Sequence, residues 1–175
     1  KYNLKMLRRS FSVMMQDFCN YAFTLRECVA LSDCSSVNNT DRIIKALEEV
    51  GAADFVNKFK NGIETYMTRI YEEEGEELSG GQWQKVALSR AFFQNGSVYI
   101  FDEPSASLDP EAEARLFSDF RSIVKEKGML LISHRLTDVK GMDKILVLSG
   151  GVILEEGSHV QLMKKEGVYK KLFML

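Results

Sequence analysis

A short apolar run that ends in two carboxylates limits most strongly what this chain can fold into. Residues 98–101 are Val-Tyr-Ile-Phe, and Asp102, Glu103 and Pro104 follow at once. Four apolar residues are typical of a buried strand, and Pro104 ends it. Apolar residues at helical spacing lie before this strand, in residues 82–95, and again after Pro110. The alternation of helix and strand predicts an α/β fold with a mostly parallel sheet.

Two further predicted strands also end in polar side chains. Residues 11–15 lead to Gln16, and residues 129–132 lead to Ser133 and His134. The carboxyl ends of parallel strands meet at one edge of a sheet, where open α/β folds bind ligands. We therefore expect Gln16, Asp102, Glu103 and His134 near one site. Residues 144–148 and 152–154 flank Ser-Gly-Gly and predict a hairpin.

Residues 20–95 are predicted to be mainly helical. Thr40 is a candidate cap for a helix that stops near Gly51, and residues 52–59 predict a second short helix. A longer helix is predicted from Gln82 to the Asn-Gly pair at residues 95–96.

Composition excludes several classes of protein. The 175 residues are 45% hydrophobic and 27% charged, as in a globular domain with a core of its own. A net charge of -2 gives no electrostatic reason to expect nucleic-acid binding. The apolar runs are far shorter than the roughly 20 residues that cross a bilayer. The three cysteines have no C-x-x-C spacing, so a disulfide framework or zinc site is not expected.

Two short motifs carry candidate chemistry. Residues 78–82 are Leu-Ser-Gly-Gly-Gln at a predicted helix start, where unhindered backbone N–H groups can bind a phosphate. The alternative is a capped helix with glycines that shape the turn. Asp102 and Glu103 can bind Mg²⁺ and orient water, or they are an acidic turn. His134 can likewise be a ligand-contacting residue or an ordinary turn residue.

Together these segments resemble the nucleotide-binding (ATPase) domain of ABC transporters, in family order along nearly the whole chain. The matching segments are Gln16, residues 78–82 (the signature), 98–103 (Walker B), 105–109 (the D-loop) and His134. The resemblance implies an α/β, partial P-loop NTPase-like (RecA-like) fold, with a mostly parallel sheet and an inserted helical subdomain. Residues 1–16 and 96–175 would form the partial core, and residues 17–95 the helical signature subdomain.

The resemblance also implies roles for individual residues. Asp102 and Gln16 would hold Mg²⁺, Glu103 would be the catalytic base, and His134 would contact the γ-phosphate of ATP. Gln16 would also sense the membrane domain. The remaining residues would act between two such domains: Ser79, Gly80, Gly81 and Gln82 on nucleotide held by the opposite subunit, and Asp109 in communication across the shared sites.

Residues 24–27 and 157–175 resemble the exporter branch of the family, in which the ATPase domain follows a membrane domain in one chain. The implied partners are the transmembrane domain of the same transporter and a second nucleotide-binding domain, identical or different. The implied location is the cytoplasmic side of the cell membrane. The acidic run at residues 72–77 is expected to be a solvated face.

No Gly-x-x-x-x-Gly-Lys-Ser/Thr loop occurs in the 175 residues. In the family this Walker A loop would lie before Lys1, so we expect a carboxyl-terminal portion that alone does not bind or hydrolyse ATP well. Two alternatives stay open. The chain is a catalytically silent interaction module that supplies its signature to a partner ATPase, or it is a soluble ABC ATPase outside transport.

Overall fold

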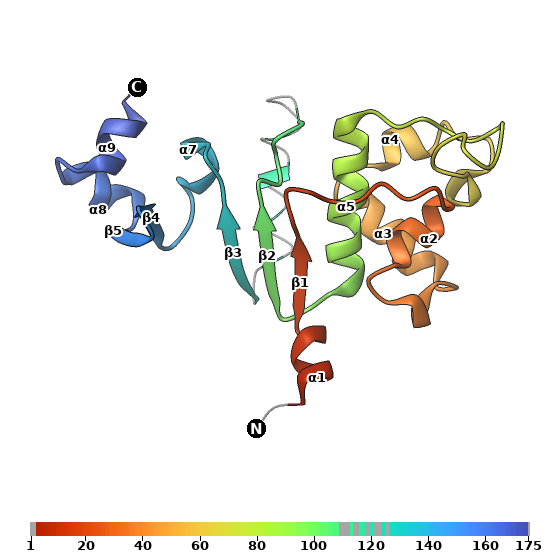
Figure 1. Ribbon diagram of the computed structural model, residues 1–175, viewed down its shortest axis with the longest axis horizontal. Coiled ribbons are helices and arrows are strands. Elements are labelled where there is room, and N and C mark those ends of the chain that lie inside the picture. Colours follow the sequence, from red (N-terminus) through yellow and green to blue (C-terminus); the bar gives the residue numbers. More distant parts are fainter. Residues whose placement is uncertain are drawn as a thin grey trace. The chain divides into compact units, whose positions relative to one another are not determined.

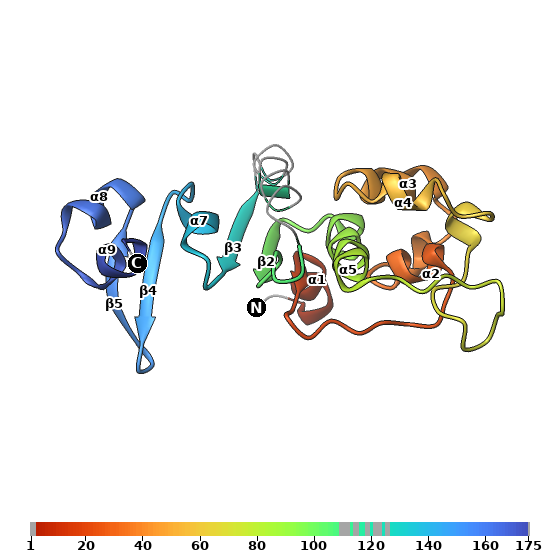
Figure 2. The same cartoon turned by 90° about the horizontal axis from the view of Figure 1, so that it is seen from above.

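The computed structural model describes residues 3–108, 113, 116, 117, 120, 124 and 127–174. The chain divides into two compact units, residues 1–132 and residues 133–175. Figures 1 and 2 show the elements of each unit from two directions. Within the described residues, no helix has both the length and the apolar character that a membrane span requires.

The first unit combines short helices, one long helix and parallel strands. Its helices are α1 (Leu4–Arg9), α2 (Leu25–Ala30), α3 (Thr40–Glu48), α4 (Ala53–Val56) and α5 (Gly80–Gln94). Its strands are β1 (Phe11–Met14), β2 (Val98–Asp102) and β3 (Gly128–Ile132). Two 3₁₀ turns, Cys34–Ser36 and Gly62–Glu64, connect the helical segments.

The strands form a parallel sheet in the order β1-β2-β3. Met14 pairs with Phe101, and Phe101 pairs with Leu131. All three strands run in the same direction, so their carboxyl ends lie at one edge of the sheet (Figure 1). The predicted α/β fold with a mostly parallel sheet is therefore confirmed.

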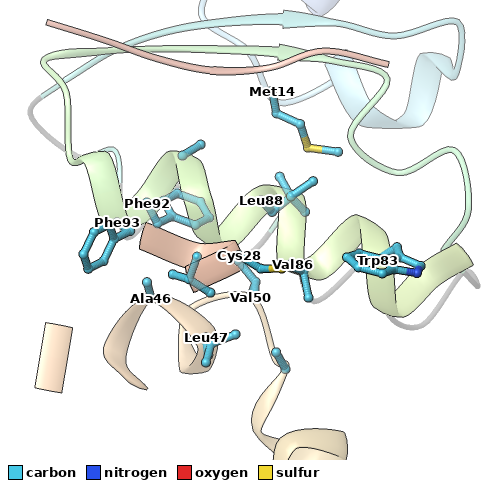
Figure 3. Packing of buried hydrophobic residues seen from close by; sticks show 14 of the residues in the cluster. Met14, Cys28, Ala46, Leu47, Val50, Trp83, Val86, Leu88, Phe92 and Phe93 are labelled. Carbon is cyan, nitrogen blue, oxygen red and sulfur yellow. The ribbon is translucent and has the colours of Figure 1, made fainter. Parts of the chain in front are cut away.

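Helix α5 packs between this sheet and the smaller helices. Figure 3 shows Met14 on the strand side of α5, and Ala46 and Leu47 of α3 on its other side. The ring of Phe92 lies 5.5 Å from the ring of Tyr99 on β2. A helix that is covered on both sides needs apolar residues around most of its circumference. This explains why α5 is buried from Trp83 through Phe93, apart from Lys85 and Arg90.

Both ends of α5 follow from local chemistry. At its start, the Ser79 hydroxyl accepts a bond from the Gln82 N–H while the Gln82 side chain accepts one from the Ser79 N–H. This capping box starts the helix at Gly80, two residues earlier than the apolar pattern predicts. At its end, Asn95 adopts the left-handed conformation, with φ of 58°.

The other predicted elements of the first unit are confirmed with shifted boundaries. The strands at residues 11–15, 98–101 and 129–132 correspond to β1, β2 and β3. The second short helix is α4 and ends at Val56, not at residue 59. Residues 65–78 contain turns and isolated bridges instead of helix, because residues 65–67 pair with residues 23–25 and residues 66–68 pair with Glu76. Helix α1 was not predicted.

The second unit contains α7 (Leu136–Val139), β4 (Ile145–Ser149), β5 (Val152–Gly157), α8 (His159–Lys164) and α9 (Val168–Phe173). Strands β4 and β5 pair antiparallel around Gly150 and Gly151, which both have positive φ. Two such residues are what a tight hairpin turn requires, so the predicted hairpin is confirmed. Ile145, Leu162 and Tyr169 form the core of this unit. The helix predicted after Pro110 falls largely outside the described residues.

Candidate nucleotide site

The edge of the sheet where its strands end carries three of the predicted site residues. Asp102 is the last residue of β2 and pairs with Ile132. Gln16 follows β1 by two residues, and Met14, the last residue of β1, pairs with Phe101, which directly precedes Asp102. Gln16 is exposed, while Asp102 and Glu103 are half-buried. The structure thus brings Gln16, Asp102 and Glu103 to one sheet edge, as the sequence predicts.

Glu103 has an unusual backbone conformation. Its φ is 52°, a left-handed value that costs a non-glycine residue roughly 1–2 kcal/mol. Hydrogen bonds hold the residue there, since the Glu103 N–H donates to the Ile132 carbonyl at 2.9 Å and the Glu103 carbonyl accepts from the Ala106 N–H at 3.3 Å. The turn therefore sets the direction in which the Glu103 side chain leaves the sheet.

The signature residues lie against the turn that follows β2. A Cβ atom added to Gly81 would approach the Ser107 carbonyl oxygen to 3.0 Å, and one added to Gly80 would lie 3.9 Å from the Ser107 side chain. Ser79 and Gly80 are exposed, while Gly81 and Gln82 are half-buried. The first N–H groups of a helix have no partner within the helix, so this start is suited to an anion.

The capping box also limits what two of these residues can do. The Ser79 hydroxyl and the Gln82 side chain each accept a bond from the other residue's N–H, at 3.3 and 2.8 Å. The structure thus contains the capped helix start that was the alternative to a phosphate site. The two functions are compatible, because a hydroxyl can accept one bond and donate another.

Arg90, on α5, holds the segment that follows Gln16. Its guanidinium donates to the Cys28 carbonyl at 2.7 Å and to the Cys19 carbonyl at 3.0 Å. It also lies 5.1 Å from the centre of the Tyr21 ring. Burial lowers the pKa of this guanidinium and raises the pKa of the Cys28 thiol. The signature helix is thus bonded directly to the loop that carries Gln16, a contact that sequence spacing did not suggest.

Gln84 is a second residue that the sequence did not single out. It is buried on α5, and its amide nitrogen donates to the Glu103 carbonyl at 3.2 Å. Its amide oxygen accepts from the Ser107 N–H at 2.9 Å. The partners are 19 and 23 residues away along the chain. Local sequence patterns do not detect contacts of this kind.

The two remaining predicted residues lie outside the described part of the first unit. Asp109 lies outside the described residues. His134 belongs to the second unit, two residues after β3 ends, and is exposed. Next to it, the Ser133 hydroxyl donates to Asp138 at 2.7 Å and accepts from the Arg135 N–H at 3.0 Å. These bonds order the turn that carries His134.

The oxygen groups at the sheet edge fit a magnesium ion. Mg²⁺ takes few protein ligands, typically one or two, and fills its other positions with water and phosphate oxygens. The Asp102 carboxylate and the Gln16 amide supply hard oxygen donors there. No group of three or more His, Cys, Asp or Glu side chains suited to a metal occurs in the part of the chain that the structure describes. The small number of protein oxygen donors agrees with a Mg²⁺ site in which water and phosphate oxygens complete the coordination.

Comparison with known proteins decides the family. The model of the family described as ABC transporter matches residues 1–106 of this chain. The chain belongs to the ABC transporter family. The matched part includes α5, residues 78–82 and the Asp102–Glu103 strand end.

Individual relatives agree with an exporter-type ABC protein. The chain is 39% identical over 166 residues to the nisin transport ATP-binding protein NisT of Lactococcus lactis subsp. lactis, covering 95% of this chain and 28% of that protein. It is 36% identical over 171 residues to the ATP-dependent lipid A-core flippase of Vibrio vulnificus, covering 98% and 28%. The leukotoxin translocation ATP-binding protein LktB of Mannheimia haemolytica is 37% identical over 170 residues, covering 97% and 23%.

A solved structure shows the same fold. The structure of a bacterial Atm1-family ABC exporter with ATP bound superimposes with a TM-score of 0.86 at 28% sequence identity. The match covers 97% of this chain and 29% of that protein. The chain therefore spans less than a third of the length of these ABC relatives.

Proposed function

We propose that this chain is the ATPase portion of an ABC exporter, which uses ATP hydrolysis to move a substrate across a membrane. The observation that carries the proposal is that β1 and β2 end at one sheet edge, where Gln16 follows β1 and Asp102 and Glu103 end β2, beside the signature start of α5. The names of the relatives support export. Residues 1–16 and 96–175 would form the ATPase core, and residues 17–95 the helical subdomain.

Each predicted catalytic or metal-binding residue has a distinct task in this proposal. Asp102 and Gln16 hold Mg²⁺, which when bound neutralises charge on the phosphate oxygens. Glu103 accepts the proton of the attacking water, and its fixed backbone turn keeps the carboxylate in place. His134 contacts the γ-phosphate, and the bonds of Ser133 order its turn.

The signature residues act on a second nucleotide-binding domain. Ser79, Gly80, Gly81 and Gln82 bind the phosphates of ATP held by the opposite subunit, through the N–H groups at the start of α5. Asp109 transmits the state of one site to the other. The partners are this second domain and the transmembrane domain of the same transporter, and the site faces the cytoplasmic side of the cell membrane.

Replacing Glu103 in the full-length transporter tests the proposal. Glu103→Gln keeps the size of the side chain but removes the base, and a positioned base contributes roughly 10² to 10⁴ in rate. We expect turnover to fall by about this factor while ATP still binds. The matched control is Glu73→Gln, which removes a carboxylate from the exposed acidic run. Equal turnover in Glu103→Gln and the control would exclude the role of Glu103 and favour a catalytically silent module.

A further inference from the structure

Gln84 links two loops that come together at the candidate site. Its side chain is 1% exposed, and both ends of its amide are bonded. The nitrogen donates to the Glu103 carbonyl at 3.2 Å, and the oxygen accepts from the Ser107 N–H at 2.9 Å. A buried amide with both ends paired has one orientation, so it fixes the distance between the two groups that it joins.

Both partners of Gln84 are placed where small shifts matter. Glu103 has φ of 52° and is kept there by backbone bonds to Ile132 of β3 and to Ala106 of its own turn. Ser107 lies against the signature, since a Cβ on Gly81 would come within 3.0 Å of its carbonyl oxygen. Gln84 itself is four residues beyond Gly80 on α5. One side chain thus connects the helix that begins with the signature, the Glu103 backbone and the Ser107 turn.

We infer that Gln84 is a positioning residue for ATP hydrolysis: it sets the orientation of the Glu103 carboxylate and links that orientation to the signature helix. This inference rests on the proposed ATPase function. Gln84 acts only through backbone groups, the Glu103 carbonyl and the Ser107 N–H, to which its amide is bonded. It therefore affects the chemical step more than the binding of ATP.

The same helix provides a matched control. The amide nitrogen of Gln94 donates to the Phe11 carbonyl at 2.6 Å. This bond also joins α5 to the backbone of the sheet, but at the first residue of β1, at the opposite end of the strands from Glu103. Removing the side-chain amide of Gln84 or of Gln94 removes at least one hydrogen bond that is partly or fully buried. Only Gln84 touches the candidate site.

The test compares Gln84→Met and Gln94→Met in the full-length transporter. Methionine has nearly the size of glutamine and cannot form these bonds. A misplaced group costs up to about 10²-fold, so we expect the kcat of Gln84→Met to fall about 10- to 100-fold. The KM for ATP should change less than about twofold, since ground-state binding is retained. Gln94→Met should keep its kcat within about twofold, although its unfolding temperature also falls because a side-chain bond is lost.

A second substitution separates the two bonds of Gln84. At a pH where its carboxylate is ionised, Gln84→Glu keeps an oxygen for the Ser107 N–H but places an oxygen, not a donor, against the Glu103 carbonyl. It should lose kcat as Gln84→Met does, because the bond to Glu103 is absent in both. If Gln84→Met does not fold, the kcat of Gln84→Glu alone tests the inference. Failure of both variants to fold would assign Gln84 to stability and overturn the inference.

The outcomes distinguish the inference from the function on which it rests. A wild-type transporter without ATPase activity would reject the proposed function. A wild-type transporter that turns over ATP, with Gln84→Met as active as Gln94→Met, would reject only the positioning role. An increase in KM without a change in kcat would also overturn it, because Gln84 would then act on ATP binding.

Discussion

Arg90 is the residue whose chemistry is hardest to replace. Its guanidinium spans two carbonyl groups, those of Cys19 and Cys28, and lies over the Tyr21 ring. A planar guanidinium donates in two directions at once, whereas an ammonium is a compact point charge. The loop after Gln16 has little regular structure of its own between β1 and α2. This side chain of α5 therefore helps to position the loop, together with the bond from the Met67 N–H to the Phe23 carbonyl.

Arg90→Lys should therefore destabilise the protein although the charge is kept. Losing one hydrogen bond from a charged group costs about 1.5–3 kcal/mol. For a unit of this size, this corresponds to an unfolding temperature lower by roughly 3 to 12 °C. Calorimetry of the full-length protein measures the change. The exposed Arg9→Lys on α1 is the control, and equal unfolding temperatures for the two variants would contradict the role of Arg90.

Among the elements, the turn from α5 into β2 lies close to the start of β1. A Cβ atom on Gly96 would lie 2.7 Å from the Ser10 carbonyl oxygen and 2.9 Å from the Ser12 nitrogen, both in the backbone. The Gly96 N–H also donates to the Ser12 hydroxyl at 2.8 Å. This turn therefore fixes where β2 starts beside β1, and with it the register that pairs Met14 with Phe101.

Gly96→Ala should break this contact. Overpacking against a backbone that cannot move costs typically 1–3 kcal/mol, about as much as a core mutation. Gly128→Ala is the matched control, because it also lies at the start of a strand but its Cβ would meet only Val98 side-chain carbons, the nearest at 3.4 Å. Thermal unfolding should show a clear loss for Gly96→Ala and little change for Gly128→Ala. A larger loss of stability for Gly128→Ala than for Gly96→Ala would show that the turn at Gly96 can shift to make room for a Cβ atom.

Sequence patterns predicted the elements that have a strong period and missed those that depend on distant partners. The strands at residues 11–15 and 98–101 were found because apolar runs end in polar residues there. Helix α1 is exposed along its whole length and has no apolar face in contact with a core, so no pattern revealed it. Gln84 and Arg90 were missed because their partners are backbone groups, which carry no sequence signal.

On the scale of the whole molecule, the two faces of the sheet are unlike each other. Met14, Phe101 and Leu131 form a cross-strand row that packs in the core beside α5. The neighbouring row, Val13, Ile100 and Leu130, lies on the other face, where the Val13 and Leu130 side chains are 42% and 50% exposed. An apolar sheet face that is open to water favours association.

The isolated 175-residue polypeptide should therefore self-associate at micromolar concentration. Light scattering is expected to give a mass above that of one chain. In the double variant Val13→Thr, Leu130→Thr, both new side chains are β-branched and suited to a strand, but they make this face more polar. The variant should therefore give a lower scattering mass than the wild-type polypeptide. A wild-type polypeptide that scatters as a single chain at all concentrations would contradict the prediction.

The isolated polypeptide should also fail to bind ATP appreciably. Asp102, Glu103 and Gln16 lie near one sheet edge. The 175 residues do not include the Gly-Lys-Ser/Thr loop with which the family holds phosphates. Three or four charge-assisted hydrogen bonds, each about 1.5 to 3 kcal/mol, amount to roughly 5 to 12 kcal/mol. A micromolar affinity requires about 8 kcal/mol in total.

Calorimetric titration with Mg-ATP should give no binding heat below millimolar concentration, and the full-length transporter is the positive control. Micromolar binding by the isolated polypeptide would mean that the strand ends and the start of α5 hold nucleotide without this loop.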